Sequence, residues 1–172
     1  MKKEDIFLLS SGHAGLALYT VLESIYNFDA EALLEQHGVH PNRDPEHKIF
    51  CSTGSLGLGL PVAVGAALAN PNRQVFCLIS DGECAEGSIW EALRFIQEQR
   101  IENLNVVVNA NGFSALSPVN RGYLEHRLRA FFPGIVIVRT PSAFEGIPAG
   151  LEAHYHIMTK EDYETASLQF TI

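Results

Sequence analysis

Residues 80–113 read SDGECAEGSIWEALRFIQEQRIENLNVVVNANGF, and this stretch decides the fold. The run Val75–Ile79 just before it and the run Leu104–Asn109 within it are short, apolar and free of proline, which is typical of strands. Between the two runs, apolar side chains recur at helical spacing, at Ile89, Trp90, Leu93 and Ile96. A strand, a helix and a second strand make a βαβ unit, whose strands are parallel. We therefore expect an α/β domain of three layers, in which helices flank a mostly parallel sheet.

Polar residues follow each of these two strands directly. Asp81 comes after the first strand, and Asn111 and Phe113 follow the second. In parallel sheets of this kind ligands bind beyond the carboxyl ends of the strands, so we expect these residues to face one ligand. The carboxylate of Asp81, the amide oxygen of Asn111 and the main-chain carbonyl of Phe113 are hard ligands that suit Mg²⁺ shared with a diphosphate. The stretch thus predicts a magnesium site that holds a phosphorylated cofactor.

The overall composition limits the classes of function. The chain has 172 residues, 47% of them hydrophobic, so we expect one domain over residues 1–172 with a sizeable core. A net charge of −8 without any basic run argues against nucleic acid or an anionic membrane as a partner. The longest run of low polarity, residues 56–69, is broken by glycines and a proline and cannot span a bilayer.

The cysteines indicate a reducing compartment. There are three of them, an odd number, and they lack the paired spacing of metal ligands, at Cys51, Cys77 and Cys84. Such residues are typical of reduced thiols, and Cys77 falls within a predicted core strand. We expect a cytoplasmic protein without disulfides.

Upstream, the sequence predicts a strand and two helices. Ile6–Leu9 is a short apolar run, and a helical face follows it, at Ala14, Ala17, Leu18, Val21, Leu22 and Ile25. His13 would therefore lie at a helix N-terminus, where free backbone N–H groups and the helix dipole favour a phosphate. A capping or buried polar role is the alternative for His13. A second helix is expected from Asp29, a good N-cap residue, to a stop at Gly38.

Residues 52–69, STGSLGLGLPVAVGAALA, are rich in glycine. Their glycines do not have the order of a dinucleotide-binding fingerprint, and no convincing strand precedes them. Pro61 suits the first turn of a helix that would run to Ala69. Because this helix carries Gly65, Ala66 and Ala67, two interpretations stay open: a helix at a subunit interface, or a core helix under the sheet.

Downstream, residues 123–132 predict a helix and residues 135–138 a fourth strand, whereas residues 140–172 form a divergent loop and tail. Within this tail, 140–150 is expected to be a loop and 160–166 a terminal helix. His154 and His156 flank Tyr155 at strand spacing, and we expect them to be structural or surface residues. His47 is expected to be a solvated surface imidazole.

The motif Asp-Gly-Glu at 81–83, with Asn111 thirty residues after Asp81, resembles the cofactor motif of the thiamine-diphosphate enzymes. DGECAEGSIWEAL followed by NLNVVVNANG is similar to the transketolase form, and not to the 2-oxoacid dehydrogenase form, which lacks the EG-x-x-WEA run. The resemblance extends from Ile6 to Val138. Two positions depart from it: Ser80 stands where the family usually has glycine, and Ala110 stands at the first position of the usual asparagine pair.

This resemblance implies the thiamine-diphosphate-binding fold and gives roles to particular residues. Contact with the cofactor or its Mg²⁺ is implied for His13, Gly54, Ser55, Leu56, Asp81, Gly82, Glu83 and Asn111. His40 would reach the thiazolium and the donor sugar, and is the group implied to be closest to the chemistry. Glu86 would join a carboxylate network that connects two active sites. The alternative for Glu86 is that it only stabilises the first turn of a helix.

The reaction that the resemblance implies is transfer of a two-carbon ketol unit from a ketose to an aldose, with sugar phosphates as substrates and thiamine diphosphate and Mg²⁺ as cofactors. In this family a Glu from a second, pyrimidine-binding domain activates the cofactor, and these 172 residues do not contain that domain. We therefore expect the N-terminal subunit of a split transketolase. Its partner would be a separately encoded pyrimidine-binding subunit, in an assembly with two-fold symmetry. Another ketol synthase, such as one making deoxyxylulose phosphate, and a non-catalytic cofactor-binding remnant stay open.

Overall fold

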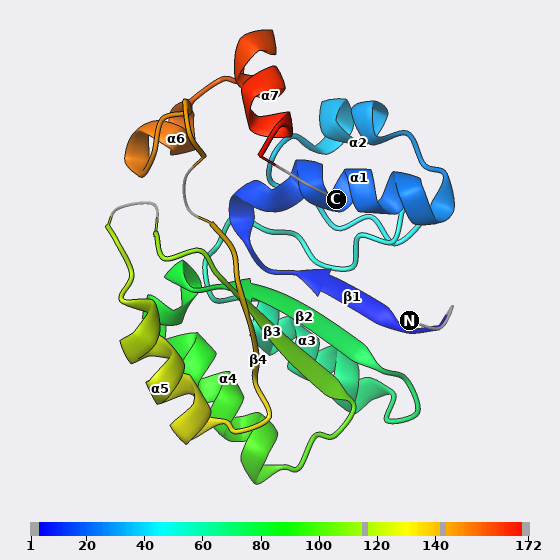
Figure 1. The fold of residues 1–172 in the computed structure, drawn as a ribbon. Helices are drawn as coiled ribbons and strands as arrows, with labels where there is room; N and C mark the ends of the chain where they lie inside the picture. The colour runs from blue at the N-terminus through cyan, green and yellow to red at the C-terminus, as the bar shows by residue number, and fades with distance from the viewer. Residues whose placement is uncertain (1–3, 115–116, 142–143, 170–172) are drawn as a thin grey trace.

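A parallel sheet of four strands forms the centre of the computed structural model, which describes residues 4–114, 117–141 and 144–169. The strands lie in sequence order (Figure 1): β1 (Ile6–Leu9), β2 (Val75–Ser80), β3 (Leu104–Ala110) and β4 (Val136–Arg139). Every neighbouring pair is parallel. The α/β class, the βαβ unit and the four predicted strands are confirmed. β4 begins one residue later than expected, because the Ile135 N–H bonds to the Phe132 carbonyl in the preceding turn.

Helices cover both faces of the sheet, as the three-layer prediction requires (Figure 1). One face is covered by α3 (Gly59–Ala69), α4 (Gly87–Glu98) and α5 (Arg121–Phe131), and the other by α1 (Gly15–Tyr26) and α2 (Ala30–His37). Successive side chains of a strand point to opposite faces, which explains the division. Ile79 of β2 is fully buried with α3 and α4, whereas Leu9 of β1 packs with α1 and α2. Each such side chain stabilises the fold by about 1.5–3 kcal/mol.

The predicted helix ends agree with local chemistry. The Asp29 side chain accepts a hydrogen bond from the Ala32 N–H at 3.0 Å and caps α2, and Gly38 ends this helix with a φ of +69°. Pro61 lies in the first turn of α3. α5 begins two residues earlier than predicted, because the Asn120 side chain caps it by accepting from the Tyr123 N–H.

The predicted apolar face of α1 is wrong in part. Leu18 and Leu22 are buried as expected, and Tyr19 is completely buried beside them. Val21 and Ile25, however, are 51% and 64% exposed. The reason is that Val21 and Ile25 line an open hollow of about 360 Å³ together with Phe7 of β1, so the helix does not close against the edge strand on that side.

The C-terminal segment contains two short helices, α6 (Leu151–Tyr155) and α7 (Lys160–Ser167), and no helix or strand within the described parts of 140–150. The loop and the terminal helix are thus confirmed. The strand spacing inferred around Tyr155 is wrong, because one helical turn forms there. His156 pairs with Asp162 at 2.8 Å, in agreement with a structural role, while the side chain of His154 lies outside the described residues. In the described parts of the chain, no helix has both the length and the apolar content needed to cross a membrane.

The three cysteines are buried and free, as predicted. Cys77 is fully buried in β2, and burial raises the pKa of its thiol. Cys84 lies in the short 3-10 turn Gly82–Ala85 between β2 and α4, and burial raises its pKa to about 12.

Candidate functional site

The candidate site lies where three neighbouring strands end. Sheet hydrogen bonding continues past the strands, since the Ser10 N–H donates to the Leu78 carbonyl and the Asp81 N–H donates to the Asn109 carbonyl. Three loops leave this edge of the sheet together, at residues 10–13, 81–86 and 111–114. These are the segments that the sequence singled out, and the parallel sheet brings them to one side of the molecule.

Asp81 and the turn after β3, residues 111–113, are in direct contact. The Asp81 carboxylate is 2% exposed and accepts from the Gly112 N–H at 2.7 Å and from the Gly82 N–H at 3.0 Å. The Asn111 amide oxygen accepts from the Phe113 N–H at 2.9 Å. Gly112 has a φ of +86°, which permits this tight turn. The predicted Mg²⁺ ligands are therefore brought together.

The donor set fits a hard divalent cation. It combines one carboxylate, one amide oxygen and one main-chain carbonyl, and a carboxylate has about four lone-pair sites, more than the backbone N–H groups around Asp81 use. Burial raises the pKa of Asp81, against the opposing effect of these N–H groups and of Arg121, and a bound cation would favour the charged carboxylate. Within the described residues there is no cluster of three or more His, Cys, Asp or Glu side chains suited to a metal. The predicted set contains one such side chain, so the Mg²⁺ assignment stays a prediction.

His13 and His40 form a second group at this edge. Their rings meet edge to face, with centroids 4.4 Å apart. The glycines beside them leave the room that this requires: a Cβ atom added at Gly12 would lie 2.9 Å from His40 Cε1, and one at Gly54 would lie 3.2 Å from His40 Nδ1. His40 Nδ1 is buried and has no hydrogen-bond partner among the described residues. A buried imidazole nitrogen in this state is a candidate for a ligand contact.

The glycine-rich loop lies beside His40 and the start of α4. Gly54, Ser55 and Leu56 are exposed, and Leu56, an apolar residue, is 47% exposed. Gly57 is buried, with a φ of +77°, and its carbonyl accepts from the Ser88 hydroxyl at 2.9 Å. The exposed half of the loop can therefore approach a ligand, while its buried half is fixed to the start of α4.

Glu83 points inward. It is fully buried, and its two carboxylate oxygens accept four hydrogen bonds from the backbone and side chains of the protein, given by the Ser10 hydroxyl, the Gly57 N–H, the Ser80 N–H and the Ser80 hydroxyl. The sequence placed Glu83 among the cofactor contacts, and that prediction is not tested here. Ser10 was missed, although its position just before Ser11-Gly12-His13 was a signal.

Glu86 is exposed at the N-cap position of α4, with extended backbone and no side-chain hydrogen bond to the helix start. Both interpretations of this residue therefore stay predictions.

Arg121 is a second residue that the sequence analysis missed. Its side chain crosses Gly112, with Nε 3.1 Å from where a Cβ would lie, and one of its N–H groups donates to the Thr140 carbonyl at 3.4 Å. Arg121 therefore connects the turn at 111–113 to the residue that follows β4.

Asp44 holds the loop that follows His40 in place through contacts with His37, His47 and Ile49. Asp44 Oδ2 lies 2.7 Å from His47 Nδ1 and 3.3 Å from His37 Nε2, and Asp44 and Ile49 exchange two backbone hydrogen bonds. The His47 side chain is 37% exposed and meets the Phe28 ring edge to face. The His47 imidazole is thus partly solvated, as expected, but it also pairs with Asp44, which the sequence did not indicate.

We expect this pairing to make the stability of the domain sensitive to acid. The hydrogen bond from His47 holds the pKa of Asp44 below its ordinary value. A carboxyl with a lowered folded-state pKa stabilises the fold above its unfolded pKa, and this stabilisation is lost as pH falls through the folded value. Asp44→Asn should therefore destabilise the domain near neutral pH, and its effect should shrink in acid as the pH falls through the lowered pKa of Asp44. Urea denaturation at neutral pH and in acid measures this, and an equal loss at both would contradict it.

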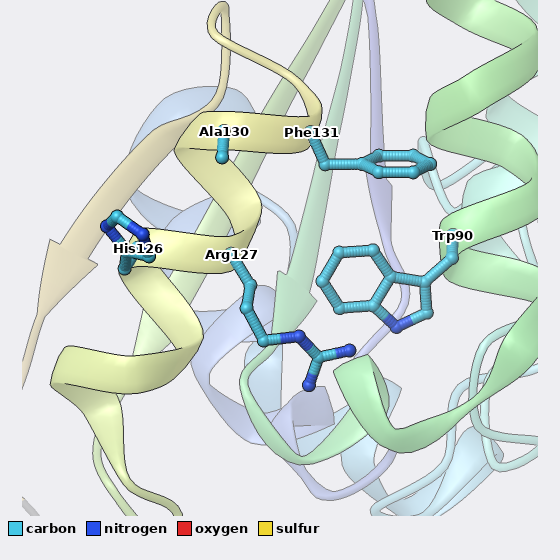
Figure 2. Close-up of a pocket in the computed structure, with 5 residues that line it drawn as sticks. All are labelled: Trp90, His126, Arg127, Ala130 and Phe131. Carbon is cyan, nitrogen blue, oxygen red and sulfur yellow. The ribbon is translucent and has the colours of Figure 1, made fainter.

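A separate hollow of about 600 Å³ lies between α4 and α5, and none of the predicted site residues lines it (Figure 2). The Arg127 guanidinium lies 4.6 Å from the centre of the Trp90 ring, and Phe131 meets the same ring edge to face. The Trp90 indole N–H donates to the Cys84 carbonyl at 2.9 Å. Trp90 packs against the core as expected, but its outer face helps to form this open hollow.

The model of the family described as "Thiamine pyrophosphate enzyme, C-terminal TPP binding domain" matches residues 29–117, more than half of the chain. The chain belongs to the thiamine pyrophosphate enzyme family. Thiamine pyrophosphate is the same compound as thiamine diphosphate, so the family implies the cofactor that the motif at 81–83 and 111 predicted. The matched model describes a C-terminal domain, and our assignment to an N-terminal section stays a prediction.

Relatives within this thiamine pyrophosphate enzyme family agree with the transketolase resemblance. Transketolase-like protein 2 of Homo sapiens is 36% identical over 130 residues, which are 69% of this chain and 21% of that protein. 1-Deoxy-D-xylulose-5-phosphate synthase of Fusobacterium nucleatum is 32% identical over 114 residues, 65% of this chain and 19% of that protein. The chain thus spans about a fifth of the length of these relatives.

A solved structure gives the same picture of the fold. Transketolase from Leishmania mexicana superimposes with a TM-score of 0.61 and 23% sequence identity, over 79% of this chain and 28% of that chain. At this identity the likeness establishes the fold alone. The α/β arrangement predicted for a thiamine pyrophosphate enzyme is confirmed.

Proposed function

We propose that this chain is the diphosphate-binding part of a transketolase-type enzyme that transfers a two-carbon ketol unit from a ketose phosphate to an aldose phosphate. The observation that supports this most directly is the single sheet edge at which Asp81, the turn at 111–113, the His13–His40 pair and the loop at 54–56 meet. Membership of the thiamine pyrophosphate enzymes supplies the cofactor for such an edge. The three buried free thiols suit the reducing cytoplasm that we propose as its location.

The roles of the residues follow from their chemistry. When bound, thiamine diphosphate supplies the carbon centre that takes up and releases the ketol unit. Asp81, Asn111 and the Phe113 carbonyl would hold Mg²⁺, which neutralises the diphosphate in a chain of net charge −8. His13 would donate to the diphosphate. His40 has a buried nitrogen without a partner among the described residues, and would hydrogen-bond the donor sugar.

The partner subunit that we propose would dock on α3 and α4. The core side of α3 is buried at Leu60, Ala63 and Ala67, whereas its other side is exposed and apolar. A groove of about 390 Å³ runs there between the two helices, lined by Pro61, Val64, Gly65, Leu68, Ser88, Glu91, Ala92 and Phe95. A Cβ atom added at Gly65 would meet nothing within 4 Å, so this side of the helix is open to a closely packed neighbour. One face of α3 thus packs in the core, as one of the two interpretations of this helix held. For its other face we propose the second interpretation, a subunit interface.

Occupancy of the site tests the proposed function directly. With Mg²⁺ present and thiamine diphosphate at a hundredfold excess over its Kd, the native state should gain about 2.7 kcal/mol. For a chain of this length, that gain corresponds to a rise in Tm of roughly 5–10 °C. Thermal denaturation with each ligand alone, and with thiamine in place of its diphosphate, provides the controls. If the melting curve did not move with both ligands present, the proposal would be wrong.

A second ketol-transfer reaction is favoured by one observation, the 32% identity to a 1-deoxy-D-xylulose-5-phosphate synthase. That enzyme type would use the same Mg²⁺ and diphosphate site, so cofactor binding does not separate the two. Supplying the assembled enzyme with a ketose phosphate donor, and in a parallel assay with the substrates of that synthase, distinguishes them by product.

A further inference from the structure

One buried carboxylate connects the three loops of the candidate site. Glu83 Oε1 accepts from the Ser10 hydroxyl at 2.6 Å and from the Gly57 N–H at 3.0 Å. Glu83 Oε2 accepts from the Ser80 N–H at 2.9 Å and from the Ser80 hydroxyl at 3.3 Å. Side chains separated by up to 73 positions in the chain thus share a single charged group that is fully shielded from solvent.

Each of these contacts stands next to a predicted ligand-binding segment. Ser10 begins the loop that ends at His13, Gly57 directly follows Leu56, and Ser80 directly precedes Asp81. Ser10 is 2% exposed and is also held from the other side, since a Cβ atom at Gly59 would lie only 2.4 Å from its hydroxyl oxygen. The relative positions of the loop at 10–13, the loop at 54–57 and the turn at Asp81 therefore depend on Glu83.

Ser80, which departs from the usual family residue, takes part in this network. Its hydroxyl donates to Glu83 Oε2 and accepts from the Glu83 N–H at 3.2 Å. A glycine at this position has no hydroxyl for either bond. In this chain the serine is therefore paired with the glutamate two residues beyond Asp81.

We propose that Glu83 is a positioning residue of the cofactor site and does not itself bind the cofactor or the metal. Ser80 is the partner through which Glu83 fixes the position of the adjacent Asp81. This inference rests on the proposed function, because the site that it positions is that of thiamine diphosphate and Mg²⁺. Bonds from neutral donors to a buried charge are strong and directional, and outer groups of this kind typically set the geometry of a metal site.

Glu83→Gln tests this role, because both carboxylate oxygens face a backbone N–H. Whichever way the amide is turned, its NH₂ group meets another donor, so one of the loops must shift. We expect the Kd for thiamine diphosphate at saturating Mg²⁺ to rise about tenfold or more. Calorimetry well below the Tm of each variant measures Kd in folded protein. Glu98→Gln, on an exposed side chain of α4, is the matched control and should leave Kd unchanged.

Ser80→Gly provides a second measurement that does not disturb a charge. We expect a loss of a few-fold in affinity in the wild-type background and no further loss in the Glu83→Gln background, since the hydroxyl acts through the carboxylate. If Glu83→Gln lowered the Tm but kept the wild-type Kd, the role would be structural only and the inference would fail. If that variant did not fold, an unchanged Kd in Ser80→Gly would overturn it. Absence of binding in the wild-type protein would instead contradict the proposed function itself.

Discussion

Asp81→Ala should abolish Mg²⁺-dependent binding of thiamine diphosphate while leaving the domain folded. The carboxylate is the only charged group in the predicted donor set, so its loss should weaken Mg²⁺ binding by at least the roughly 10–100-fold typical of losing a supporting group. The cost to the fold is smaller. The Gly82 and Gly112 N–H groups each lose an acceptor, at about 1–3 kcal/mol per buried group, against a typical total stability of about 5–15 kcal/mol. Burial raises the pKa of Asp81, which means that the fold disfavours its charged form. The alanine variant does not bury this charge, which offsets part of the cost.

Calorimetric titration of Mg²⁺ and thiamine diphosphate, together with circular dichroism of the free protein, checks both halves of this expectation. Asp81→Asn is the matched comparison, because it keeps the shape of the side chain and one acceptor but removes the charge. Binding of the cofactor to Asp81→Ala with the wild-type Kd would remove Asp81 from the metal site. If Asp81→Ala did not fold, the hydrogen bonds that Asp81 accepts from Gly82 and Gly112 would contribute more to stability than we expect.

The second large effect should appear on mixing the chain with a separately encoded pyrimidine-binding subunit. In our proposal the partner supplies the carboxylate for the other end of the cofactor, while this chain supplies the Asp81 turn and the His13–His40 pair, so we expect no measurable turnover from the chain alone. With the partner, transfer of the ketol unit should approach an ordinary enzyme rate, on the order of 10 per second. A steady-state assay with a ketose phosphate and an aldose phosphate gives the rate, and sedimentation velocity gives the association.

The groove on α3 and α4 allows a sharper form of this test. Leu68 is 52% exposed in the groove, so Leu68→Asp should weaken the association and the activity together. Ile157 is 88% exposed in the C-terminal segment, and Ile157→Asp should change neither. Turnover by the chain alone would contradict the split arrangement. If the two proteins neither associated nor became active, the interpretation as a non-catalytic remnant would replace it.

Much of the fold was predictable because local signals and tertiary packing agree. The β2–α4–β3 unit has short apolar strands around a helix with one apolar stripe, and Asp29 and Gly38 mark the ends of α2 by capping and by a positive φ. The contact between Asp81 and the turn at 111–113 was predictable because parallel strands end on the same edge, so the two segments had to come together once the βαβ unit was assigned.

Three features that the sequence did not indicate depend on information that local sequence does not carry. The exposure of Val21 depends on how far α1 extends over the edge of the sheet, which periodicity cannot give. The inward direction of Glu83 depends on donors at Ser10 and Gly57, which are distant in the chain. Arg121 reaches Gly112 from the first turn of α5, which is a tertiary contact that local sequence does not predict.

The buried thiol in the turn at 82–85 has a practical consequence. Only a thiolate reacts readily with disulfide or alkylating reagents, and Cys84 is both shielded and held protonated by a pKa raised to about 12. Its modification must therefore wait for the turn between Asp81 and Glu86 to open. Measured separately from labelling at Cys51 and Cys77, the labelling rate of Cys84 should therefore report openings of the turn that follows Asp81, without an engineered cysteine.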